Sequence, residues 1–122
     1  MAGLSQAEQV ATLDARFPTS GATDHIAYSI NGTSEWSGLA RTAIGATGWA
    51  AATNATPSVK ANSAALTSAA ATGAGTVTHF ALFSAATGGT QRTDWTAFAD
   101  SKTFAVGDRA THAVGAIQVT LD

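Results

Sequence analysis

The chain contains no cysteine among its 122 residues and carries little charge. The absence of cysteine excludes disulfide bonds, zinc sites with cysteine ligands and thiol catalysis. The formal net charge of -2 argues against a basic surface that could hold nucleic acid or an anionic membrane. The sequence has no apolar run of about 18 residues, so it predicts no membrane-spanning helix. We therefore expect neither nucleic-acid nor membrane partners.

Large aliphatic and aromatic side chains are also scarce. Alanine supplies 29 of the 55 hydrophobic residues, whereas leucine, isoleucine, valine and phenylalanine together supply only 21. Alanine removes much less apolar area from water than leucine does, so the core is expected to be thin. Low net charge argues against disorder. The sequence therefore predicts a single folded domain over residues 1–122 that gains part of its stability from neighbouring subunits.

The N-terminal segment has the features of a short helix. Ser5 and Glu8 have the spacing of a capping box, in which each side chain bonds to a backbone amide of the other residue. Apolar residues follow at three- and four-residue spacing until Pro18 ends the pattern. These signals predict a helix over residues 5–16.

The apolar side chains of this segment form a candidate interface. Leu4, Val10, Leu13 and Phe17 would share one face of the helix. This face either covers the sheet of its own chain or packs against a partner. Trp36 is a second candidate, because its polar and small neighbours predict that it is the most exposed of the three tryptophans. Such a residue could contact a sugar or a neighbouring subunit.

From residue 25 onward, alternation of side chains replaces helical spacing. The expected strands are His25–Ile30, Leu39–Ile44, Val59–Thr67, Thr76–Phe83, Trp95–Phe98, Thr103–Val106 and Ala110–Leu121. Asn31-Gly32 is the strongest signal for a two-residue hairpin turn. Strands at intervals of about ten residues, separated by glycine turns, predict a mainly β fold. We expect a small antiparallel β-sandwich or barrel over residues 25–122, preceded by one short N-terminal α-helix.

Motifs for catalysis are missing from the sequence, which has no nucleophile elbow, phosphate-binding loop or dinucleotide-binding glycine pattern. Its three histidines, His25, His79 and His112, do not have metal-ligand spacing. We therefore expect no catalytic, cofactor-binding or metal-binding residues and no enzymatic activity. The remaining enzymatic alternative is a small hydrolytic or carbohydrate-active domain that uses Asp94, Asp100 or Asp108, although aspartates near predicted turns more often support the backbone.

Several segments together resemble a known family. They are LARTA at residues 39–43, VTHFALFSAATGGT at residues 77–90, VGD at residues 106–108 and the closing GAIQVTLD. These segments look like those of small virion proteins from tailed phages of actinobacteria, which are labelled minor capsid (head decoration) or tail-fibre-like proteins. The resemblance covers residues 39–122. Ala81 stands where the family usually has glycine, and residues 25–32 differ from the family's early strand and turn, which leaves the partner open.

The resemblance implies a structural role in a virion. Our first hypothesis is a head decoration protein, a homotrimer on the capsid surface that binds and stabilises the lattice of the major capsid protein. The sequence start lacks the features of a secretory signal, which suits assembly in the host cytoplasm. The alternative is a tail-fibre or minor tail protein with a receptor- or carbohydrate-binding role.

Overall fold

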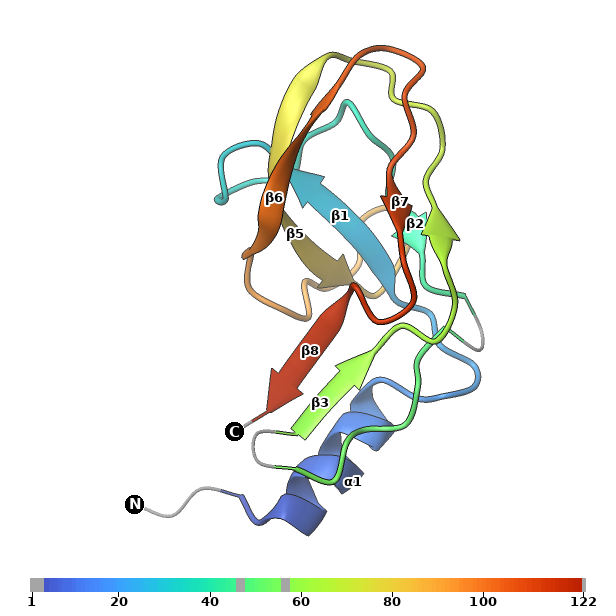
Figure 1. Cartoon of the computed structure of the whole chain (residues 1–122), viewed down its shortest axis with the longest axis vertical. Coiled ribbons are helices and arrows are strands. Elements are labelled where there is room, and N and C mark those ends of the chain that lie inside the picture. The colour runs from blue at the N-terminus through green and yellow to red at the C-terminus, as the bar shows by residue number, and fades with distance from the viewer. Residues whose placement is uncertain (1–3, 46–47, 56–57, 122) are drawn as a thin grey trace. The chain divides into compact units, whose positions relative to one another are not determined.

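A computed structural model of the chain describes residues 4–45, 48–55 and 58–121 (Figure 1). Its elements are α1 (Gln6–Arg16), β1 (His25–Ser29), β2 (Thr42–Ala43), β3 (Ser58–Ala61), β4 (Leu66–Thr67), β5 (Gly75–Phe83), β6 (Thr96–Phe104), β7 (Thr111–His112) and β8 (Gln118–Leu121). The predicted fold class is confirmed, because the described chain is mainly β with one short helix and antiparallel strand pairs. Its strands do not close into a barrel. No helix in the described part is long and apolar enough to cross a membrane.

Helix α1 begins and ends where the sequence predicts. The backbone amide of Glu8 donates to the hydroxyl of Ser5 across 3.3 Å, which satisfies one of the free amides at the helix start. At the other end, the amide of Phe17 donates to the carbonyl of Leu13 across 2.8 Å. Pro18 follows immediately and cannot continue the helix.

The described residues fall into two compact units, and each is considered separately. The first unit contains the described residues of Met1–Ala22, Ile44–Ala65 and His112–Asp122. The second unit contains Thr23–Ala43 and Leu66–Thr111. The expectation of a single domain stays a prediction.

In the first unit, α1 lies beside β3, which pairs antiparallel with β8 (Figure 1). Its core includes Phe17 and Trp49, whose ring centroids are 5.6 Å apart in an edge-to-face arrangement. Leu13 and Ile117 are buried in the same unit. The side-chain oxygen of buried Gln9 accepts a hydrogen bond of 3.1 Å from the amide of Ser58, which fixes the helix against the first residue of β3.

The second unit contains a four-stranded antiparallel sheet in the order β2-β1-β5-β6. Five consecutive residues of β1 pair with β5, from His25 opposite Phe83 to Ser29 opposite His79. Phe80, Ala81 and Leu82 are all buried, so both faces of β5 are covered at this point, as its apolar alternation predicts. The sheet therefore carries most of the large side chains available to this unit.

Several predicted strands have different lengths in the structure. The segment predicted at Leu39–Ile44 pairs only as β2, and Val59–Thr67 is divided into β3 and β4. The predicted final strand is divided into β7 and β8 by a turn in which Gly115 has φ of 81°. Because glycine adopts positive φ without steric cost, Val114-Gly115 forms a turn where the hydrophobic pattern alone suggested continuity.

The prediction of a two-residue hairpin turn at Asn31-Gly32 was wrong. The two residues do form a turn, in which Gly32 has φ of 76° and the Asn31 side-chain oxygen accepts from the amides of Thr33 and Ser34. They do not form a two-residue hairpin turn, because the connection from β1 to its antiparallel partner β2 is a long loop that ends only at Thr42. The Asn31 side chain replaces the ladder hydrogen bonds with local ones, as asparagine commonly does in turns.

Candidate functional site

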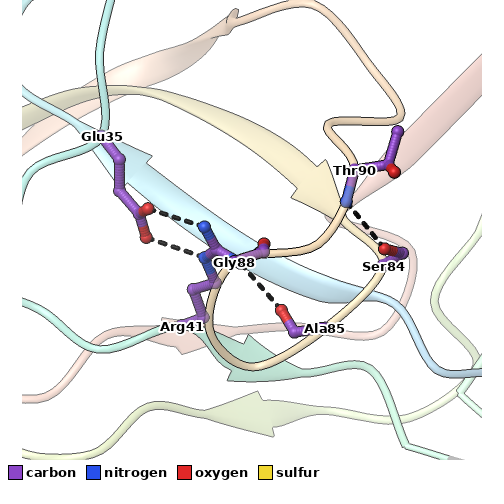
Figure 2. Close-up of polar contacts among 6 residues, drawn as sticks. All are labelled: Glu35, Arg41, Ser84, Ala85, Gly88 and Thr90. Atoms are coloured by element: carbon purple, nitrogen blue, oxygen red, sulfur yellow. Dashed lines mark hydrogen bonds and ion pairs between the residues drawn. The ribbon is translucent and has the colours of Figure 1, made fainter.

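Arg41, next to β2, organises an exposed polar turn of the second unit. Its Nε and Nη2 donate to the two carboxylate oxygens of Glu35 across 2.9 and 2.8 Å, respectively. Its Nη1 donates to the carbonyls of Ala85 and Gly88 across 2.9 and 2.7 Å (Figure 2). The planar fork of arginine suits such a set of acceptors, which a lysine could not contact in the same way.

The same side chain also stacks on an aromatic ring. The central carbon of the Arg41 guanidinium lies 3.9 Å from the centroid of the Phe83 ring. Only 8% of the Arg41 side chain is exposed to solvent. Its fork is thus occupied by partners within the chain, and the cation is covered on one side by Phe83. Arg41 therefore serves to position the turn and is not free to bind an anionic ligand.

The turn held by Arg41 spans residues 84–91 and has a second set of hydrogen bonds near its base. The amide of Ser84 donates to the carbonyl of Thr90 across 3.0 Å, and the amide of Thr90 donates to the Ser84 hydroxyl across 2.9 Å. Gly88 and Gly89 have positive φ values of 62° and 73°. A side chain at Gly89 would also lie 2.7 Å from the Ser84 hydroxyl, so the turn requires glycine there.

Residues 86–91 present a polar, uncharged surface. All six are exposed, and they read Ala-Thr-Gly-Gly-Thr-Gln. The hydroxyls of Thr87 and Thr90 can donate and accept hydrogen bonds, and the small residues between them expose the peptide backbone. We call residues 84–91 the Arg41-held turn. Its chemistry suits recognition of neutral polar groups, such as sugar hydroxyls, better than recognition of charge.

Trp36 is half-buried rather than freely exposed. Its indole ring packs over glycines, because a side-chain carbon added at Gly38 would overlap the ring, and one added at Gly75 would lie 3.0 Å from its Cζ2. A carbon added at Gly73 would lie 3.7 Å from the same ring atom. Trp36 thus uses part of its apolar area within the second unit, and its role as a contact residue stays a prediction.

The helical candidates are divided between core and surface. Leu13 and Phe17 are buried at 3% and 6% exposure, whereas Val10 is half-buried and Leu4 is 47% exposed. The first two side chains are therefore occupied within the first unit. Of the four, Leu4 is the most available to a partner.

Two of the histidines and Tyr28 make local contacts. His25 Nδ1 lies 2.8 Å from the carbonyl of Thr23, and His79 Nδ1 lies 2.8 Å from the Thr78 hydroxyl. Burial raises the pKa of Tyr28 to about 12, although its hydrogen bond to the Thr42 hydroxyl opposes that shift. Within the part of the chain that the structure describes, no three histidine, aspartate or glutamate side chains gather at a metal-binding distance.

The three candidate aspartates lie at different places along the chain: before β6, within β6 and in the turn after it. Asp108 supports a turn as predicted, because its carboxylate accepts from the amide of Ala105 across 2.9 Å. Asp94 lies just before β6, and its backbone carbonyl accepts from the Thr96 hydroxyl. Asp100 lies inside β6, so its predicted position near a turn was wrong. The hydrolytic alternative has gained no support from this arrangement, and the absence of enzymatic activity stays a prediction.

Comparison with known proteins identifies the type of protein. A search of curated proteins finds no match. A family model described as Podophage GP4 fiber I protein gp80 matches residues 6–120, which is nearly the whole chain. This match supports the resemblance to phage virion proteins at the level of a phage structural protein, and the family description names a fibre and not a head decoration protein. The chain therefore belongs to this podophage fibre protein family.

Proposed function

We propose that the chain is a non-enzymatic component of a tail fibre that contacts carbohydrate on the host surface through the Arg41-held turn. The proposal depends on one observation: the side chains of this turn are exposed to solvent, while its backbone is held by hydrogen bonds. Residues 86–91 are exposed, whereas Arg41 and Ser84 hold its backbone in place. A recognition loop that is ordered before binding loses less conformational entropy when it meets its ligand.

The chemistry of the turn favours a neutral ligand rich in hydroxyl groups. Thr87 and Thr90 offer hydroxyls, and Gly88 and Gly89 let a ligand approach the peptide groups closely. Arg41 itself is covered and occupied, so a charged ligand would find no free cation there. Weak contacts of this kind become effective when several copies bind one surface together. A multicopy fibre is suited to such binding.

The position in the virion can be tested by separating heads from tails on a density gradient and measuring this chain in each fraction by quantitative mass spectrometry. Recovery with the tails, and not with the heads, supports the fibre proposal. Recovery with the heads, in a fixed ratio to the major capsid protein, would instead establish the head decoration role and reject the proposal.

The contact surface can be tested with the purified protein on host cells. The double variant Thr87→Ala and Thr90→Ala is expected to lower the amount of bound protein at least about tenfold if both hydroxyls contact the ligand. Thr111→Ala, at an exposed position outside the turn, is the matched control and should bind as the unchanged protein does. Equal binding by all three proteins would show that the turn is not the contact surface.

A further inference from the structure

Asn31 is exposed and is followed by Gly32, a pairing that lets an asparagine lose ammonia without an enzyme. In this reaction the backbone nitrogen of Gly32 bonds to Cγ of Asn31, and the bond between Cγ and Nδ2 breaks. The departing amino group takes up the amide proton of Gly32 and leaves as ammonia. Water then opens the cyclic imide to aspartate or isoaspartate. Glycine favours the attack because it has no side chain to obstruct the approach and its backbone rotates easily.

The side chain of Ser29 engages the attacking nitrogen in the folded chain. The Gly32 amide donates to the Ser29 hydroxyl across 2.9 Å, and the amide of Asn31 donates to the same oxygen across 3.2 Å. The hydroxyl donates in turn to Oδ1 of Asn31 across 3.0 Å. Ser29 itself is fully buried. Because a hydrogen-bonded amide loses its proton to base only after local opening, this contact holds back the first step of the reaction.

The side-chain amide of Asn31 is held as well. Its Oδ1 accepts from the amides of Thr33 and Ser34 across 2.9 and 3.0 Å, and from the Thr33 hydroxyl across 3.1 Å. Its Nδ2, the leaving group of the reaction, donates to the Ser34 hydroxyl across 3.2 Å. The side chain therefore has to give up several hydrogen bonds before its Cγ can turn toward the attacking nitrogen.

Packing restrains the other partner of the reaction. A side-chain carbon added at Gly32 would lie 2.9 Å from Cε1 of His79, so the imidazole ring lies directly against the Gly32 backbone. Nδ1 of His79 is 2.8 Å from the Thr78 hydroxyl, which fixes the ring. His79 also faces Ser29 across the β1–β5 ladder. The turn at residues 29–34 is thus held by two side chains from neighbouring strands.

We propose that Asn31 is a modification site of the second unit, which deamidates when the turn at residues 29–34 opens and which Ser29 keeps closed in the folded chain. The product carries a new carboxylate at an exposed position. Where the product is isoaspartate, the backbone is one carbon longer, so the turn cannot regain the same hydrogen bonds. A transient opening is thereby converted into a permanent change. The inference does not depend on the proposed carbohydrate contact.

Comparison of the folded and unfolded chain provides the first test. The full chain is kept in mildly alkaline buffer with and without guanidinium chloride, and tryptic peptides are analysed by mass spectrometry. Asn31 lies in the peptide 17–41, whereas the internal reference Asn54, which precedes Ala55, lies in the peptide 42–60. Asn31 should deamidate at least about tenfold more slowly in the folded chain than in the unfolded chain. An equal or faster rate in the folded chain, or an unfolded rate no higher than that of Asn54, would overturn the proposal.

Replacement of Ser29 tests which residue closes the turn. Ser29→Ala removes the acceptor of the Gly32 amide, so deamidation and hydrogen exchange of this amide should each become about tenfold faster. The matched control is Ser68→Ala, because Ser68 is also a buried serine of the second unit, and its hydroxyl accepts from the amide of Ala110 outside the turn. This control should leave the rate at Asn31 unchanged. Equal acceleration by both variants, or none by Ser29→Ala, would show that Ser29 is not the closing residue.

A third measurement needs no variant and therefore does not depend on whether Ser29→Ala folds, which circular dichroism verifies. Hydrogen exchange of the Gly32 amide is followed by NMR in the unchanged protein. We expect this amide to be protected, since it donates to a buried hydroxyl. Exchange as fast as that of an unstructured amide would contradict a closed turn and with it the proposal.

Discussion

Lys60 Nζ donates a hydrogen bond of 2.5 Å to Asp14 Oδ1, although the lysine side chain is fully buried and the aspartate side chain is 40% exposed. The pair joins α1 to β3 within the first unit. The same carboxylate oxygen accepts from the amide of Ala52 across 3.0 Å. The Asp14 carboxylate, at the surface, therefore balances the charge of the buried Lys60 and also holds the loop at Ala52 in place.

The unequal burial of this pair predicts unequal effects of mutation. Asp14→Ala leaves the Lys60 charge buried without its partner, and we expect a loss of about 3 kcal/mol in the free energy of unfolding. Lys60→Met removes the charge and retains a side chain of similar volume, so the loss should be less than about 1 kcal/mol. Urea denaturation of the two variants measures both values. A larger loss for Lys60→Met than for Asp14→Ala would contradict this account.

The same pair predicts a dependence of stability on pH. The hydrogen bond from Lys60, and then the one from Ala52, lower the pKa of Asp14 below its ordinary value of 3.8. Because the pKa is lower in the folded than in the unfolded state, the stabilisation is complete above the ordinary value and is lost as pH falls through the folded pKa.

Asp14→Asn separates this effect from the titration of other carboxyl groups. The difference in unfolding free energy between the unchanged protein and this variant should be constant near neutral pH and shrink as pH falls below 3.8. The measurement is a series of urea titrations across this range. A difference that stays constant down to strongly acidic pH would show that the Asp14 carboxylate is not the group concerned.

The Arg41-held turn should depend on the shape of the guanidinium and not only on its charge. Arg41→Lys keeps the charge but cannot bond to both oxygens of Glu35 and to two carbonyls of the turn, so we expect a loss of about 2 kcal/mol. Amide hydrogen exchange at Thr90 should become faster, since the base of the turn opens more often. Arg109 provides a matched control, because among the described residues its side chain donates a single hydrogen bond, of 3.1 Å, to the carbonyl of Ser68. An Arg109→Lys variant with an equal loss of stability would contradict the special role of Arg41.

The sequence predicted α1 correctly because its determinants are local. The capping residue Ser5 and the stop at Pro18 lie within one segment, and the helix needs no distant contact to define its ends. The central strand β5 was similarly clear from its alternation. Gly115 is a local signal for the division of the final strand, but the apolar alternation continues on both sides of it and by itself predicts one strand.

The candidate site could not be predicted in the same way. Arg41 contacts Ala85 and Gly88, which are 44 and 47 residues away in sequence. Nothing in the residues next to Arg41 indicates which distant carbonyls it will meet. The Lys60–Asp14 pair, 46 residues apart, was missed for the same reason. The placement of Asp100 inside β6 was missed because the two short strands predicted on either side of it form one irregular strand.

The contact between the Trp36 ring and Gly38 can be tested as a feature of the packing of the second unit. A side-chain carbon at Gly38 would overlap the indole ring, whereas one at Gly73 would meet its nearest atom, Gly38 Cα, at an ordinary distance of 3.5 Å. We expect Gly38→Ala to destabilise the protein by about 2 kcal/mol and to shift the indole N–H resonance of Trp36, because the ring must move. Gly73→Ala should change stability by less than about 0.5 kcal/mol, since the added methyl group fits and the unfolded chain becomes less flexible. Urea denaturation and two-dimensional NMR measure both effects. If the two variants behave alike, the ring does not rest on Gly38, and Trp36 becomes free to act as the exposed contact residue that its polar neighbours first suggested.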